Sequence, residues 1–93
     1  MGKYIVFFEP KATEDIKSYK KAGNKISLAR INRILEELEI HPETGIGKPE
    51  KMRHKKKELW SRRIDEKNRM TYKIEENIIT VTVISALGHY DDK

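Results

Sequence analysis

Several side chains in the second half of the sequence have the chemistry to move protons or to hold a phosphate. Glu50, His54 and His89 can donate or accept protons, and Arg63 and Arg69 can bind phosphate oxygens. Such a set can cleave RNA without a metal. A base removes the 2′-OH proton, an acid protonates the leaving 5′-oxygen, and a guanidinium stabilises the charged phosphorane. Because any basic domain contains a carboxylate and a histidine, these residue types alone leave catalysis and simple binding both open.

Other common chemistries lack their residues or their spacing. The chain has no cysteine, which excludes disulfides, thiolate nucleophiles and thiolate metal sites. The three histidines do not have the spacing of metal ligands. The segment from Gly45 to Lys48 resembles part of a phosphate-binding loop, but it lacks the full motif and does not open a helix. No serine lies in a nucleophile-elbow motif. We therefore expect a site with no metal and no cofactor.

The positive charge is concentrated in one quarter of the chain. The formal net charge is +5, but residues 48–73 contain eleven Lys or Arg and four Asp or Glu, which gives +7 there and −2 elsewhere. A basic stretch with interleaved aromatic residues favours a nucleic-acid backbone as partner, because each neutralised phosphate releases counterions. A simple solvated surface remains the alternative.

Length and composition favour one small domain. The 93 residues leave no room for two cores, so residues 1–93 are expected to form a single domain. The longest apolar run, Ile78 to Gly88, is too short to span a bilayer. No secretory signal is recognisable at the start of the chain. We expect a cytoplasmic protein with no membrane partner.

The first elements are expected to be a strand and a helix. Residues 3–8 are apolar and β-branched or aromatic, which predicts a buried strand that Pro10 ends. Thr13 is the expected cap of a helix that runs to Ala22, with Gly23 just beyond its end.

A second helix should follow at once and form a helical hairpin with the first. Asn24 is its expected cap, and His41-Pro42 ends it. Its apolar positions have helical spacing and predict a face in the core: Ile26, Ala29, Ile31, Ile34, Leu35 and Leu38.

The rest of the chain is expected to be a sheet. Strand patterns cover residues 59–64, 68–74 and 78–87, with a further short strand at 51–55. Tight connections are expected at residues 65–68 and 76–77. This order predicts an α+β fold in which an antiparallel sheet of three to four strands packs on the helices with one face.

Alternation along these strands predicts a basic open face. Met70, Tyr72 and Ile74 should face the helices, as should Trp60 and Ile64 on the preceding strand. The other face then carries Ser61, Arg63, Arg69, Thr71 and Lys73. Such a face could hold an RNA or DNA strand.

A set of short motifs resembles a known family. They are Gly47-Lys48-Pro49-Glu50, Trp60-Ser61-Arg62-Arg63-Ile64, Asn68-Arg69-Met70-Thr71-Tyr72 and His89-Tyr90. In this order they resemble the YoeB toxins of the RelE superfamily, over about residues 3–90. The resemblance implies a RelE-like fold and a type II toxin. Such a toxin is a ribosome-dependent endoribonuclease that cuts mRNA at the A site, inhibits translation and is neutralised by a cognate YefM-like antitoxin.

The resemblance also implies roles for individual residues. Glu50 would be the general base, His89 the general acid, and Arg69 would stabilise the transition state. Arg63 would contact the phosphate, and Tyr90 would stack on a base or orient the phosphate. The residues expected to bind RNA are Lys48, Lys51, Arg53, His54 and Arg62. A homodimer is expected from the same resemblance, and an acidic antitoxin segment that folds on binding suits the basic surface.

Two other functions stay open at this point. One is a basic module that binds nucleic acid or protein without cutting, and the other is a ParE-like toxin of the same fold that poisons gyrase. Cleavage requires Glu50, Arg69 and His89 to surround one cleft. Unbroken alternation from Val83 would place His89 on the core face, and a bend at Gly88 would turn it back. The three residues Asp91-Asp92-Lys93 extend beyond the usual end of the family motif.

Overall fold

The computed structural model describes residues 3–52 and 59–88. In chain order its elements are β1 (Ile5–Phe8), α1 (Pro10–Lys21), α2 (Lys25–Leu38), β2 (Glu50–Met52), β3 (Leu59–Arg63), β4 (Arg69–Glu75), a 3₁₀ turn (Glu76–Ile78) and β5 (Thr80–Ser85). This arrangement confirms the expected α+β class. None of the helices in the described ranges is long and apolar enough to cross a membrane.

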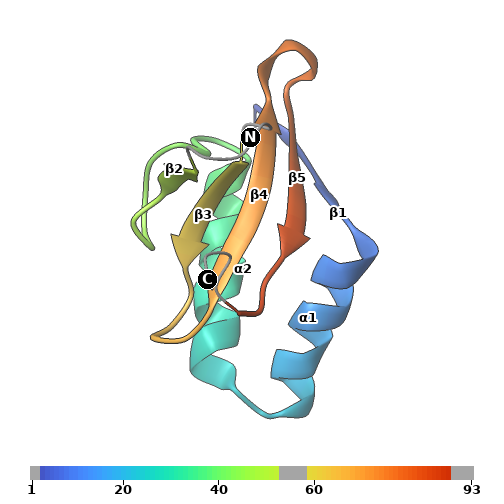
Figure 1. Cartoon of the computed structure of the whole chain (residues 1–93), viewed down its shortest axis with the longest axis vertical. Helices are drawn as coiled ribbons and strands as arrows, with labels where there is room; N and C mark the ends of the chain where they lie inside the picture. Colours follow the sequence, from blue (N-terminus) through green and yellow to red (C-terminus); the bar gives the residue numbers. More distant parts are fainter. Residues whose placement is uncertain (1–2, 53–58, 89–93) are drawn as a thin grey trace.

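The five strands form one mixed sheet in the order β1-β5-β4-β3-β2 (Figure 1). Strands β2 to β5 pair in antiparallel fashion, as expected. Strand β1 pairs with β5 in parallel, with Ile5 opposite Thr80. The short strand expected at residues 51–55 is β2, and residues 53–55 lie outside the described residues.

Both helices cover one face of this sheet. The core combines Ala12 and Tyr19 of α1 with Ile31, Ile34 and Leu38 of α2. From the sheet it includes Met70, Tyr72, Ile74, Val81 and Val83. The apolar side chains of β4 therefore face the helices, as predicted. Trp60 is partly buried and packs against the same core. In Figure 1, α2 passes behind the sheet, which leaves the opposite face free of helices.

The helix boundaries differ from the prediction at one end. The first helix begins at Pro10 rather than after Thr13, and no side chain caps it. Proline suits the first helical position, since its fixed φ matches the helix and its missing N–H is not needed there. The cap of α2 is as expected, because the Asn24 side chain accepts a hydrogen bond from the Ser27 N–H.

The first strand is not buried, contrary to the prediction. Because β1 is an edge of the sheet, Ile5, Phe7 and Phe8 expose 60%, 56% and 42% of their surface. Ile26 and Ala29 of α2 are also exposed, so the apolar stripe of that helix begins later than expected.

A bulge in β5 changes which face its residues occupy. Tyr72 pairs with Val83 but Thr71 pairs with Ser85, so β5 contains one extra residue, Ile84. Ser85 therefore lies on the face of Thr71, whereas Val83 lies on the core face. Ala86 follows Ser85, so it should face the core, and it is fully buried. The alternation thus breaks at Ile84, before the bend that the sequence predicted at Gly88.

Candidate active site

The helix-free face of the sheet brings a carboxylate and a guanidinium together. Glu50 of β2 lies opposite Ser61 of β3, which lies opposite Thr71 of β4. Arg69 begins β4 and reaches across this row. Its Nη2 is 3.4 Å from Glu50 Oε1, and its Nε donates to Ser61 Oγ at 3.1 Å. The Arg69 side chain is 15% exposed and that of Glu50 66%, so a held cation faces an accessible carboxylate.

Backbone and amide contacts fix the position of Arg69. The Arg69 N–H donates to the Gly88 carbonyl at 3.1 Å, and the Gly88 N–H donates to Asn68 Oδ1 at 2.9 Å. Gly88 has a φ of +81°, so the expected bend is present. Gly88 therefore lies directly beside Arg69.

Asp65 holds the turn that precedes β4. Its carboxylate accepts from the Lys67 and Asn68 N–H groups, the Asn68 side chain and the Ser27 hydroxyl. Burial opposes the charged form most strongly, but these hydrogen bonds outweigh it and hold the pKa of Asp65 below its usual value. The connection expected at residues 65–68 is thus a rigid, charged turn.

Two side chains of α1 hold the backbone that follows β5. Asp15 Oδ2 accepts from the Ala86 N–H at 2.9 Å, and the Tyr19 hydroxyl donates to the Ala86 carbonyl at 2.6 Å. Burial, followed by the charges of Asp65 and Asp15, raises the pKa of Tyr19 strongly, so the hydroxyl stays a donor. Two side chains one helical turn apart thereby position the backbone that leads to Gly88.

A second basic feature lies next to this site. An open hollow of about 360 Å³ is lined by Lys48, Arg63 and Arg30, with Gly47, Ile64, Asp65 and Glu66. Arg63 is exposed, and it shares its register position with Arg69 on the neighbouring strand. The hollow therefore offers an anion three cations beside two acidic residues, of which Asp65 is already engaged in the turn.

The remaining expected RNA contacts are only partly described. Lys51 is exposed, but it lies opposite Trp60, which packs on the core, and so occupies the other side of β2 from Glu50. Arg53, His54, His89 and Tyr90 lie outside the described residues.

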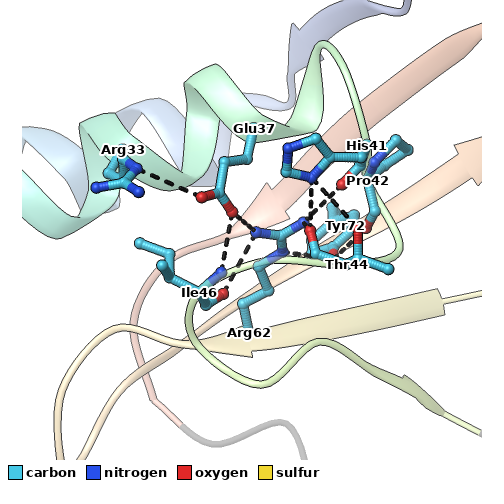
Figure 2. A network of polar contacts seen from close by, with 8 residues as sticks. All are labelled: Arg33, Glu37, His41, Pro42, Thr44, Ile46, Arg62 and Tyr72. Carbon is cyan, nitrogen blue, oxygen red and sulfur yellow. Dashed lines mark hydrogen bonds and ion pairs between the residues drawn. The ribbon is translucent and has the colours of Figure 1, made fainter.

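Arg62 does not fit the RNA-binding set, and we correct that assignment. Its side chain is fully buried, and its guanidinium points from β3 toward α2 and the loop after it (Figure 2). Nη1 lies 2.6 Å from Glu37 Oε1, so a buried ion pair replaces the expected RNA contact. The alternation that places Trp60 and Ile64 toward the helices also places Arg62 there, which is the signal that was available in the sequence.

Sequence reasoning missed three supporting residues. Asp15 and Glu37 are acidic side chains buried on helix faces, and Arg30 completes the basic hollow. Glu37 is three residues from Ile34 and follows the buried stripe of α2, which is the only hint that its sequence position offers.

The contact between Glu50 and Arg69 joins a proton acceptor to a fixed positive charge. Within residues 3–52 and 59–88, no three His, Asp or Glu side chains are grouped so that they could hold a metal ion. A carboxylate and an arginine in contact can respectively accept a proton and stabilise a developing negative charge.

Comparison with known proteins supports the resemblance carried by the motifs. A family model described as "YoeB-like toxin of bacterial type II toxin-antitoxin system" matches residues 8–90. The toxin YoeB of Mycobacterium bovis is 38% identical over 85 residues, which cover 91% of this chain and 96% of that relative.

Solved structures give the same result. The YoeB dimer from Staphylococcus aureus has a TM-score of 0.81 and 29% identity, and covers 95% of this chain and 99% of its own. YoeB in the heterotetrameric YoeB-YefM complex from the same organism has a TM-score of 0.77 and 31% identity, covering 94% and 98%. The archaeal RelE-RelB complex from Pyrococcus horikoshii, at 15% identity, a TM-score of 0.75 and coverage of 97% and 99%, shows that the fold is RelE-like. The chain therefore belongs to the YoeB-like toxins of bacterial type II toxin–antitoxin systems.

Proposed function

We propose that this toxin is a ribosome-dependent endoribonuclease that cuts translated mRNA at the A site and so inhibits translation. The observation that carries the proposal is the contact between Glu50 and Arg69 on the helix-free face. A basic surface that only bound RNA would need no carboxylate beside its best-held arginine, since a negative charge there repels phosphate. A gyrase poison of the same fold would have no evident use for this pair.

The reaction would need three functional groups and no external cofactor. The Glu50 carboxylate would take the proton from the ribose 2′-OH, and the resulting oxygen would attack the adjacent phosphorus. The Arg69 guanidinium would stabilise the additional negative charge on the phosphorane. His89 would give its proton to the departing 5′-oxygen, leaving a 2′,3′-cyclic phosphate and a 5′-OH. The hydrogen bond from the Arg69 N–H to the carbonyl of Gly88, the residue before His89, supports this assignment.

The basic hollow would bind the neighbouring phosphates of the strand. Lys48 and Arg63 line it from two elements, and Arg30 adds a third cation from α2. These contacts would set the register of the RNA. Lys51, Arg53 and His54 are proposed as further backbone contacts, and Tyr90 would stack on a base beside the cleaved bond.

The ribosome would supply much of the alignment. Glu50 is well exposed, and its contact with Arg69 is long for a hydrogen bond between charged groups. Orienting the reacting groups can lower a barrier by several kcal/mol, on the order of 7–11 in the most favourable cases. We therefore expect the free protein to cleave RNA much more slowly than the ribosome-bound protein.

The decisive experiment is a cleavage assay on purified 70S ribosomes programmed with a defined mRNA. Primer extension should map cuts to the A-site codon for the wild type. Glu50→Ala, Arg69→Ala and His89→Ala should each lower the rate by about 100- to 10,000-fold. Lys20→Ala is the control, because it removes an exposed cation of α1, on the helix side of the sheet, and should leave cleavage unchanged.

Other outcomes of this assay would point to the alternatives. Folded wild-type protein that binds RNA but makes no cuts would favour a binding module. Absence of cuts together with loss of supercoiling by gyrase would favour a ParE-like activity. Cuts that persist in Glu50→Ala and Arg69→Ala would refute the assigned roles.

We also propose a YefM-like antitoxin as the binding partner. The support is the S. aureus YoeB-YefM complex, the basic stretch from 48 to 73 and the uncovered apolar residues of β1. An acidic segment should bind more weakly as salt increases, because its charges are screened. Titration calorimetry with the product of the neighbouring gene at two salt concentrations would test this.

Self-association is a separate proposal, supported by the S. aureus YoeB dimer. Sedimentation equilibrium of the free toxin should give twice the monomer mass. A monomer at all concentrations tested would exclude it.

A further inference from the structure

Arg62 is a completely buried arginine whose guanidinium makes five hydrogen bonds to protein atoms. Nε donates to the Tyr72 hydroxyl at 3.0 Å and Nη1 to Glu37 Oε1 at 2.6 Å. The other three donors go to backbone carbonyls of His41, Thr44 and Ile46. This use of all five donors suits a planar guanidinium and could not be reproduced by a lysine.

The acceptors are gathered from one segment without regular structure. Residues 39–49 connect α2 to β2, and three of their carbonyls converge on Arg62 (Figure 2). The Tyr72 hydroxyl donates to a further carbonyl, that of Pro42, at 2.8 Å. An irregular segment has no strand ladder to satisfy its carbonyls, so these side chains take the place of a ladder.

Glu37 ties the same loop to α2. Its Oε1 accepts from Arg62 and from the Ile46 N–H, and its Oε2 lies 3.4 Å from Arg33 Nε. Burial opposes its charge most strongly. The hydrogen bonds from Arg62 and Ile46 and the two arginine charges outweigh burial and keep the pKa of Glu37 below its usual value. The carboxylate is therefore ionised and bound at neutral pH.

The loop runs from this network directly into the site. After Ile46, the Gly47 carbonyl accepts from the Arg63 N–H at 2.7 Å, and three residues later Glu50 begins β2. Arg62 and Arg63 are neighbours that point to opposite faces of β3. Arg62 thus holds the loop from the core side of β3, and Arg63 carries a cation on the site side.

We propose that Arg62 is a positioning residue, which with Glu37 holds residues 41–47 so that the Glu50 carboxylate stays in contact with Arg69. This inference rests on the proposed function for its catalytic consequence, but its structural part stands on the loop itself. Arg62 would act through Glu50 and would never touch RNA.

The test compares variants that keep the fold but remove the tether. Replacing both charges, with Arg62→Met and Glu37→Leu, avoids leaving either one buried and unpaired, and such double replacements are often tolerated. Amide hydrogen exchange of residues 41–50 should rise about tenfold or more, with β4 and β5 little changed. The cleavage rate at saturating ribosome should fall about 100-fold, with half-saturation nearly unchanged. Glu36→Leu is the matched control, because it makes the same replacement at the exposed neighbour of Glu37 on α2, and it should change neither.

Each result decides the proposal. A folded double variant with wild-type exchange at residues 41–50 would overturn it, as would full activity of Arg62→Lys. If the double variant does not fold, Tyr72→Phe is the deciding variant, because it removes only the hydroxyl that joins Arg62 to Pro42. It should raise exchange at residues 41–46, and unchanged exchange there would equally overturn the proposal. If wild-type protein cuts no mRNA, the proposed function fails while the exchange comparison still decides the role of Arg62.

Discussion

A single methyl group at Gly47 should disturb the site more than the same group at another glycine of similar conformation. Gly47 has a φ of +81°, and an added Cβ would lie 2.8 Å from the Arg63 carbonyl oxygen and 3.2 Å from its nitrogen. Gly23 has a φ of +69°, but a Cβ there would meet nothing within 4 Å. The pair Gly47→Ala and Gly23→Ala therefore separates steric conflict from conformational cost.

The magnitudes follow from the two environments. A left-handed conformation costs an alanine about 1–2 kcal/mol, and the stiffer unfolded chain returns about 0.4–1 kcal/mol. Gly23→Ala should thus lose about 0.5–1 kcal/mol. Gly47→Ala must also move backbone, which strains the hydrogen bond from the Arg63 N–H to the Gly47 carbonyl, worth about 0.5–1.5 kcal/mol. Its total loss should be about 1–2.5 kcal/mol.

Thermal unfolding followed by circular dichroism measures the difference. At roughly 4–8 °C per kcal/mol for a domain of this size, Gly23→Ala should lower Tm by about 5 °C and Gly47→Ala by about 10 °C. Below both transitions, Gly47→Ala should also reduce cleavage, because Lys48 and Glu50 follow the displaced residue, whereas Gly23→Ala should not. Equal Tm shifts in the two variants would refute the steric argument, and wild-type cleavage by Gly47→Ala would refute its link to the site.

Three further predictions concern the supports of Arg69 and the chain end. Ser61→Ala removes the oxygen that holds Arg69 Nε, so ribosome-dependent cleavage should fall about ten- to 100-fold with little change in Tm. Tyr19→Phe leaves the buried Ala86 carbonyl without its donor and should lower the free energy of unfolding by about 1–3 kcal/mol in urea titrations. Folding lowers the pKa of Asp65, so its stabilisation is present above the unfolded value of 3.8 and is lost as pH falls through the folded pKa. As the pH falls below 3.8, the Tm of Asp65→Asn should therefore decrease less than the Tm of the wild type.

Each of these results has a clear opposite. Full activity of Ser61→Ala would mean that Arg69 needs no help from β3. An unchanged unfolding free energy for Tyr19→Phe would mean that water replaces the hydroxyl at Ala86. Parallel pH profiles for Asp65→Asn and wild type would show that the turn carboxylate titrates alike in both states.

The strands and the basic face could be predicted because period-two alternation is a local property of the sequence. Met70, Tyr72 and Ile74 face the core, as expected. The same rule places Arg62 in the core, yet the charge of arginine argued for the surface. Only the position of Glu37, twenty-five residues away on a helix, makes that burial possible. A residue pattern cannot show such a distant partner.

The exposure of β1 was unpredictable for a related reason. Its residues have the composition of a central strand. A local sequence pattern does not show whether a strand has neighbours on both sides or lies at the edge of a sheet, as β1 does. The bulge at Ile84 has no mark in the sequence either, because it depends on how β5 aligns with β4. The helix start at Pro10 was available from the sequence, since proline can begin a helix as well as end a strand.

The parallel pairing of β1 with β5 has a consequence for how the toxin is made. The first strand leaves the ribosome early, but its partner, Thr80–Val83, is near the end of the chain. The Gly88 carbonyl that receives the Arg69 N–H emerges later still. While residues 80–88 remain in the exit tunnel, the nascent chain lacks both the edge pairing of its sheet and the support of Arg69, so the site can be assembled only after these residues have emerged. A protein that we propose attacks ribosomes would thus have no assembled site during most of the synthesis of this domain.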